Sequence, residues 1–488
     1  MKTFNKLTLI FLTILTISVG CEDYIDVEPT GVQDTENFFR SPQDYEQALT
    51  AAYDLLQTSY LSIWIGEIAS DNSLAGGESP TDTEGLHQID NMNHGGVNAE
   101  LRDIMRYNYA GITRVNYIFE NQDNIEFEGK DQILAQAHFL RAYYYFELTK
   151  FFGGMPLIID RRLGINEIST IQRSSIEDMY SQIESDLQAA AEVLPWTNPV
   201  KGRITKGAAL ALLGRAYLYQ DKFEQAATVL QRVIDEGPYD LFDDYSTMFF
   251  LENEDNIETV FSIQYVGIEG GSYGCFVCLE GFAAPGFHGI RQYEGPLYGD
   301  GNSYNVPTAD LYNSYNVGDI RRDASVLDIE AFAADNDGVS YAEGYQHTGY
   351  FNNKYIKRAD ERGAPDDDLT SPLNHQVIRY ADVLLMAAEA LARQASPDEA
   401  TALDYLNEVR ARVDLDPVSS SGQDLINDIW QERRWEFAGE GLRFFDLVRT
   451  GQAEAEIDGF TPGKHELFPI PQVEIDLAGA GWEQNPNY

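Results

Sequence analysis

The chain has few cysteines, few basic residues and no internal hydrophobic run long enough to span a bilayer. Three cysteines in 488 residues are too few to build a disulfide-dense scaffold. Its 34 lysines and arginines stand against 79 acidic residues, which gives a formal net charge of -45. A negatively charged surface repels the phosphate backbones of nucleic acids. The composition therefore argues against nucleic acid as a partner.

Motifs of the common enzyme classes are also missing. The sequence contains no P-loop, nucleophile elbow, H-E-x-x-H motif or dinucleotide fingerprint. With so many acidic residues, carboxylates reach glycosidase-like separations by accident, so no catalytic residue is predicted. Acidic runs at Glu252 to Asp255 and Asp366 to Asp368 offer ligands for Ca²⁺, although solvated loops are the simpler interpretation. We therefore predict a protein that is not an enzyme and has no metal or other cofactor, with a structural Ca²⁺ as the alternative.

The N-terminus carries the features of an export signal. Lys2 and Lys6 precede an apolar run from Leu7 to Val19, interrupted only by Thr and Ser. This run of 13 residues is too short to cross a hydrocarbon core of about 30 Å as a helix. The small residue Gly20 and then Cys21 follow it, as in a lipoprotein signal.

We therefore expect residues 1–20 to be removed and Cys21 to become the acylated first residue of a mature chain, residues 21–488. Ser18 departs from the usual motif, which has Leu at that position. An ordinary signal peptide followed by a coincidental cysteine is the alternative.

Helical periodicity dominates the mature chain. Ser41 and Pro42 begin a predicted helix that extends to Thr58, with apolar residues three or four apart on one face. Further helices are predicted over residues 101–121 and 131–152, the latter ended by two glycines and a proline. Short β-rich pieces at residues 156–159 and 259–265 complete this part.

Residues 203–239 resemble a tetratricopeptide repeat, a pair of antiparallel helices. Leu213, Gly214, Tyr217, Ala226 and Pro238 have the spacing of such repeats, in which small residues let two helices approach closely. Similar pairs are predicted over residues 377–413, with the second helix starting at Ser396 and Pro397, and over 424–450. One repeat cannot bury its own apolar face, so we predict a mainly α scaffold of about four stacked helix pairs, with long irregular loops and a few short strands.

Six motifs in order resemble the SusD/RagB family of outer-membrane nutrient-binding lipoproteins. They are Arg141 to Phe146 running into Phe152 to Leu157; Arg203 to Leu210 with Gly214 to Tyr219; Ile378 to Ala390; Leu406 to Arg410; Glu432 to Phe437 with Arg443 to Leu447; and Leu467 to Pro471. The resemblance covers most of the mature chain and implies a single domain.

The resemblance also implies a role. Members of the family lie lipid-anchored on the cell-surface side of the outer membrane, capture oligosaccharides without catalysis and deliver them to a SusC-like TonB-dependent transporter. Glu22 and Asp23 are similar to the surface-export signal of such lipoproteins. Peptides or other nutrients are the alternative cargo. The motif residues, among them Arg379, Asp382, Arg433 and Glu436, mix opposite charges on helices, which favours structural ion pairs over ligand binding.

We expect ligand contacts in two insertions, near residues 60–100 and 266–304. The second is rich in glycine and in aromatic rings that can stack on sugars, including Tyr273, Phe276, Phe287, Tyr293 and Tyr298, with Arg291 to bind hydroxyls. A loop packed on its own aromatics is an equal alternative. The first insertion offers Trp64, Asp71 and Asn72, although a Trp followed by Ile65 and Ile68 is typical of a core.

Cys275 and Cys278 form a C-x-x-C pair within the second insertion. A redox motif would need a strand before it and a helix after it, and a zinc site would need two more ligands. In an oxidising exterior we favour a local disulfide that stiffens the aromatic loop.

Overall fold

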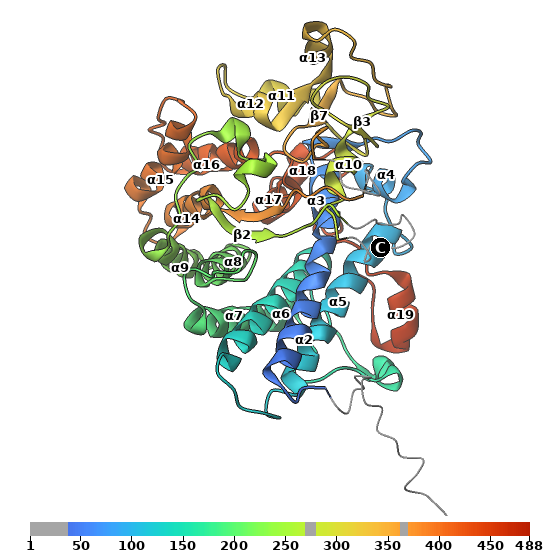
Figure 1. The fold of residues 1–488 in the computed structure, drawn as a ribbon, viewed down its shortest axis with the longest axis vertical. Coiled ribbons are helices and arrows are strands. Elements are labelled where there is room, and N and C mark those ends of the chain that lie inside the picture. Colours follow the sequence, from blue (N-terminus) through green and yellow to red (C-terminus); the bar gives the residue numbers. More distant parts are fainter. Residues whose placement is uncertain (1–37, 269–279, 362–368) are drawn as a thin grey trace, which may run out of the picture.

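Three stretches of the chain, residues 38–268, 280–361 and 369–488, are described by a computed structural model (Figure 1). The expected signal peptide and Cys21 lie outside them. Within these stretches no helix has the length and apolar character needed to cross a membrane.

A stack of helices forms the scaffold, and its members pack in chain order, α5 on α6 and onward through α9, which packs on α14 (Figure 1). The helices are α2 (Pro42–Asp54), α5 (Ala99–Glu120), α6 (Lys130–Phe152), α7 (Ile176–Val193), α8 (Lys206–Leu218), α9 (Phe223–Glu236), α14 (Tyr380–Arg393), α15 (Glu399–Arg412) and α16 (Gln423–Glu436). The fold is mainly α, as the sequence predicts.

Local signals in the sequence explain several helix ends. Ser41 caps α2 and forms a reciprocal capping box with Asp44, and Pro42 occupies the first helical position. Gly153 ends α6 with a positive φ of 73°. A Cβ at Gly214 of α8 would lie 2.5 Å from Leu230 Cγ of α9, so glycine permits the close approach of this repeat.

Two expectations need correction, and one helix was not predicted. Residues 156–159 form no strand, because Tyr145, Tyr109 and Asn116 side chains bond the backbone of Pro156 and Ile158 in place of a neighbouring strand. Helix α15 begins later than predicted, at Glu399, where Asp398 caps it. Helix α7, which the sequence analysis missed, packs on α6 through a bidentate pair between Asp186 and Arg141.

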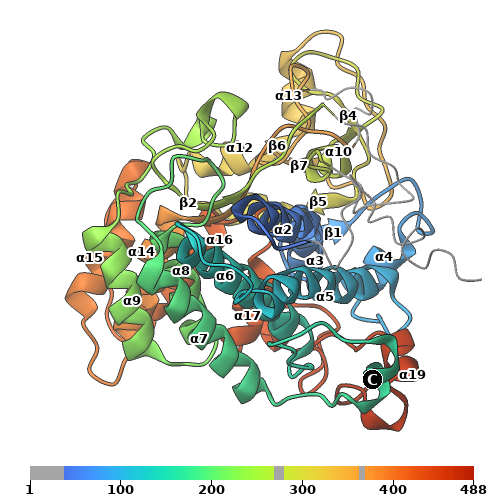
Figure 2. The same ribbon diagram turned by 60° about the horizontal axis from the view of Figure 1, so that its bottom comes forward.

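Short elements fill the rest of the molecule. The helical ones are η1 (Leu55–Ser59), α3 (Tyr60–Ile68), α4 (Glu84–Asp90), η2 (Ile165–Thr170), η3 (Tyr245–Thr247), η4 (Leu251–Asn253), α10 (Ala284–His288), α11 (Ala309–Ser314), α12 (Arg321–Ser325), α13 (Ile329–Asp335), α17 (Arg443–Arg449), α18 (Ala453–Glu456), α19 (Gln472–Ala478) and η6 (Gly479–Gly481). Residues 280–360 gather at one end of the helical stack, next to α3 and α4 (Figures 1 and 2).

Strands occur in two-stranded pairs. Antiparallel pairs join β1 (Ser73–Ala75) to β5 (Asn305–Pro307), β2 (Thr259–Ile263) to β8 (His375–Arg379) and β6 (Val326–Asp328) to β7 (Tyr350–Asn352), while β3 (Ile290–Arg291) runs parallel to β4 (Asp300–Gly301). The pairing of β1 with β5 matters for function, because it brings the two predicted insertions together.

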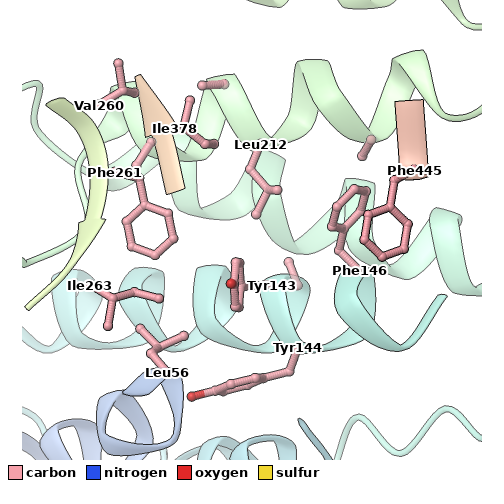
Figure 3. Packing of buried hydrophobic residues seen from close by; sticks show 14 of the residues in the cluster. Leu56, Tyr143, Tyr144, Phe146, Leu212, Val260, Phe261, Ile263, Ile378 and Phe445 are labelled. Carbon is pink, nitrogen blue, oxygen red and sulfur yellow. The ribbon is translucent and has the colours of Figure 1, made fainter. Parts of the chain in front are cut away.

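The main core runs through the helical stack, and Figure 3 shows the part that lies between α6, α8 and β2. Tyr143 of α6 meets Phe261 of β2 edge to face, with ring centroids 5.7 Å apart. Leu212 of α8 and Ile378 of β8 close the same layer. The aromatic motif of α6 is therefore a packing motif.

Candidate functional site

The two predicted insertions meet at one aromatic cavity of about 430 Å³. Trp64 belongs to α3 and Phe287 to α10, and Tyr304 is the residue just before β5. The ring of Phe287 lies 4.3 Å from that of Trp64, and Tyr304 meets Trp64 edge to face at 6.0 Å between centroids. Segments far apart in the sequence thus build one wall. We call this hollow the aromatic cavity.

Helix α5 supplies the opposite wall and most of the polar rim. Tyr107 adds a fourth ring, and Ala99, Arg102, Asp103 and Arg106 line the hollow from the exposed side of the helix. These α5 residues were not predicted as site residues from the sequence. Their charges, three or four apart on a helix, look like an ordinary solvated face, so no local signal distinguishes them.

Burial widens the pH range over which three acidic groups at this site, the Tyr107 and Tyr304 hydroxyls and the Glu100 carboxyl, stay neutral. It raises the pKa of Tyr107 and of Tyr304, in each case with a further increase from a nearby aspartate. Burial likewise raises the pKa of the Glu100 carboxyl, which also lines the cavity. Neutral hydroxyls both donate and accept hydrogen bonds, which suits a ligand rich in hydroxyl groups.

One donor at the cavity wall lacks a partner. The Trp64 Nε1 atom is buried and has no hydrogen-bond acceptor among the described residues. Trp64 as a whole is only 5% exposed and belongs to the main core cluster. Trp64 therefore has both of the roles considered from the sequence, because it packs in the core and also borders the cavity.

Asp71 and Asn72 are held by arginines of the C-terminal motifs. Asp71 accepts a bidentate pair from Arg443 at 2.7 and 2.9 Å and also bonds Arg434. Asn72 is fully buried, and its Oδ1 accepts from Arg434 Nε at 2.9 Å. Neither lines the aromatic cavity. These contacts are structural, because they join the first insertion to the C-terminal motifs. A ligand role for Asp71 and Asn72 stays a prediction.

Three predicted residues of the second insertion do not line the cavity, and their polar groups are already engaged. Arg291 donates to the Asn302 carbonyl at 2.7 Å and to Ser303 Oγ at 3.3 Å. Tyr293 donates to the Pro296 carbonyl, and Tyr298 bonds Asn353. These bonds fit the alternative of a loop packed on itself. Tyr273, Phe276, Cys275 and Cys278 lie outside the described residues.

The charged motif residues form buried ion-pair networks, as predicted. Arg379 bonds Glu258, Glu436 and Glu440, all of them buried. A second network joins Arg433 to Asp382 at 2.6 Å and to Asp446 at 2.9 Å. These contacts link β8, α14, α16 and α17, so the structural interpretation of the motifs is confirmed.

The described residues contain no cluster of three or more His, Cys, Asp or Glu side chains arranged to hold a metal ion. In the acidic run near residue 254, Glu254 bonds Asn374 and Asp255 bonds Lys201 and Gln264. Residues 366–368 lie outside the described ranges.

Two other hollows, of about 270 and 340 Å³, adjoin the segment from Lys201 to Arg203 before α8, and the larger is also lined by Glu280 of the second insertion. Their walls mix polar and apolar surface. Arg203 is paired with Glu46, and Lys201 with Asp255. The aromatic cavity is the better candidate because it joins both insertions and carries four aromatic rings.

Comparison with known proteins agrees with this fold. Residues 323–488 match the SusD family, and residues 23–218 match a family described as "Starch-binding associating with outer membrane". A solved "Laminarin binding SusD-like protein" is 34% identical, with a TM-score of 0.85 over 92% of this chain and all of its own. The chain belongs to the SusD family.

Two further relatives span almost the whole chain. "SusD-like protein P2" of Formosa agariphila is 29% identical over 99% of this chain and 100% of its own. The "Surface glycan-binding protein A" of Bacteroides thetaiotaomicron, solved in complex with laminarihexaose, is 26% identical, with a TM-score of 0.80 over 92% of this chain and 100% of its own. Membership in the SusD family thus rests on more than nine-tenths of the chain.

Proposed function

We propose that this SusD-family protein binds glycan chains of the laminarin class in the aromatic cavity, on the cell surface and without cleaving them. The observation that carries the proposal is the meeting of Trp64, Tyr107, Phe287 and Tyr304 around one open hollow with a polar rim. The half-buried Tyr304 ring can stack on the C–H face of a sugar, the buried rings of Trp64, Tyr107 and Phe287 give the cavity an apolar wall, and the rim groups bond hydroxyls.

The relatives support the choice of sugar. Two proteins that share the fold over more than nine-tenths of this chain are named for laminarin or solved with laminarihexaose. Laminarihexaose is uncharged, so the strongly acidic surface of this chain does not repel it.

A binding role also fits the carboxylates at the cavity. Asp103 is paired with Arg102 at 3.4 Å, and burial raises the pKa of Glu100. We infer that these groups bind hydroxyls. A raised carboxyl pKa also suits a general acid, so the non-catalytic role is supported by the relatives, which are named as binding proteins. The lipid anchor at Cys21 and delivery of cargo to a SusC-like TonB-dependent transporter belong to the same proposal, supported by the family resemblance.

Titration calorimetry with laminarihexaose tests the proposal, followed by chromatography of the recovered sugar. We expect saturable binding and intact hexasaccharide. Absence of binding, with binding of peptides in its place, would overturn the choice of ligand class. Release of shorter sugars would overturn the non-catalytic role. Co-purification with a SusC-like barrel of the same organism tests the transport partner.

A further inference from the structure

A second hollow begins on α5 where the aromatic cavity ends. It has a volume of about 330 Å³ and lies between α5, the segment from Pro156 to Ile171, and the C-terminal residues Glu474 and Trp482. Arg106 lines both hollows. The two are therefore neighbours separated by one side chain. Glu474 belongs to α19, which lies beside α5 in Figure 1.

The exposed stripe of α5 connects them. Ala99, Arg106 and Thr113 are spaced by seven residues, so they follow one side of the helix, and all three are exposed. Ala99 lines the aromatic cavity and Thr113 lines the second hollow. The helix axis between Ala99 and Asn116, the last α5 residue that lines the second hollow, is roughly 25 Å long. The two hollows together are therefore long enough to form an extended groove.

Arg106 has the free donors that such a groove needs at its middle. Among the described residues it forms no ion pair, and its guanidinium lies 5.7 Å from the centre of the Tyr107 ring. The two other arginines of the second hollow are engaged, Arg161 with Glu167 and Arg162 with Glu120. Arg106 is thus available to bond a ligand that passes over it.

The second hollow repeats the chemistry of the first. Tyr109 and the half-buried Trp482 add aromatic surface, and Ile158 and Leu163 add apolar surface. Glu474 provides a carboxyl group whose pKa is raised by burial. Aromatic and apolar walls with a few polar groups are what a sugar chain needs in order to continue.

We propose that the second hollow is a further subsite for the same glycan chain, which passes from the aromatic cavity over Arg106 and places additional sugar units against Tyr109 and Trp482. This inference rests on the proposed function. It implies that chain length governs affinity: short sugars occupy the aromatic cavity alone, whereas long chains occupy both hollows.

Thr113→Trp tests this directly, because an indole at an exposed position fills the second hollow without removing a buried group. The matched control is Thr228→Trp on α9, since Thr228 is also exposed and its hydroxyl, like that of Thr113, bonds the carbonyl four residues earlier. Titration calorimetry would compare both variants and the wild type with laminaritriose and laminarihexaose.

We expect Thr113→Trp to weaken laminarihexaose binding roughly tenfold, which is about 1.4 kcal/mol, and to leave laminaritriose binding unchanged. The unchanged triose affinity also shows that the variant is folded. Thr228→Trp should match the wild type with both sugars.

Wild-type affinity of Thr113→Trp for laminarihexaose would overturn the second subsite and leave the proposed function intact. An equal loss for both sugars would also overturn it, because the two hollows would then not be separate subsites. Failure of the wild type to bind either sugar would instead overturn the proposed ligand class.

Discussion

The rings of Trp64 and Phe287 lie 4.3 Å apart, tilted by 51°, although 223 positions separate the two residues in the chain. This contact joins α3 to α10 and forms the inner wall of the aromatic cavity. Both rings are almost wholly buried. The wall of the proposed site is therefore also part of the core, and its rigidity comes from packing.

Phe287→Ala should consequently lower the free energy of unfolding by about 3–5 kcal/mol, the usual cost of removing a buried aromatic ring. Urea denaturation measures it. Leu297→Ala is the control, since Leu297 is 64% exposed in the same insertion and should change stability by no more than about 0.5 kcal/mol. Equal effects of the two substitutions would show that Phe287 is not packed as described.

Arg379→Met should destabilise the fold strongly. The substitution removes the cation that pairs with all three buried carboxylates, Glu258, Glu436 and Glu440, and leaves them only their pairs with Arg412, Arg321 and Lys354. Breaking such a network costs about 3–5 kcal/mol. Arg322→Met removes an exposed pair with Asp323 and should cost less than about 1 kcal/mol. Thermal and urea denaturation would measure the loss of stability in both variants. Similar losses for the two would contradict a structural role for the network.

Glu67 should make stability depend on pH near neutrality. Burial raises the pKa of its carboxyl to about 7, although hydrogen bonds from the backbone of Gly441 and Gly439 and the charge of Lys354 lower it. The folded chain then holds a proton that the unfolded chain releases near pH 4.5. The contribution of this group to stability is full below pH 4.5 and is lost as the pH rises through 7.

Glu67→Gln removes this titration. From pH 5 to pH 8 the wild type should lose stability relative to the variant, by up to about 3 kcal/mol, as measured by urea denaturation at each pH. Glu84→Gln, at an exposed position of α4, should follow the wild-type profile. A constant difference between wild type and Glu67→Gln across this range would be inconsistent with the raised pKa.

Cys21→Ala should abolish lipid attachment. In a host that processes lipoproteins, the wild type should incorporate labelled fatty acid and sediment with membranes, whereas the variant should carry no label. Cys275→Ala retains Cys21 and should be labelled normally. Labelling of the Cys21→Ala variant would refute the predicted anchor.

The sequence predicted elements whose determinants are local. The repeat of α8 and α9 was visible because Gly214, Tyr217 and Ala226 have fixed spacing, and the start of α2 because Ser41 and Pro42 are adjacent. Residues 156–159 were predicted wrongly because their backbone partners are side chains of α5 and α6, which strand propensity does not reveal.

The site was predictable only in part, for the same reason. Aromatic composition identified Trp64 and Phe287, but nothing local shows that α5 faces them. Asp71 and Asn72 looked like free polar loop residues, yet their partners Arg434 and Arg443 lie more than 360 positions further along the chain. Only the three-dimensional fold brings them together.

Glycan binding in the aromatic cavity can be tested by blocking the cavity from α5. Ala99→Trp places an indole in the cavity from an exposed position at the first turn of α5, and Thr228→Trp serves as the control. We predict that Ala99→Trp weakens laminarihexaose binding at least tenfold in titration calorimetry, a loss of about 1.4 kcal/mol or more, while Thr228→Trp binds like the wild type. Unchanged affinity of the Ala99→Trp variant would contradict the assignment of the site.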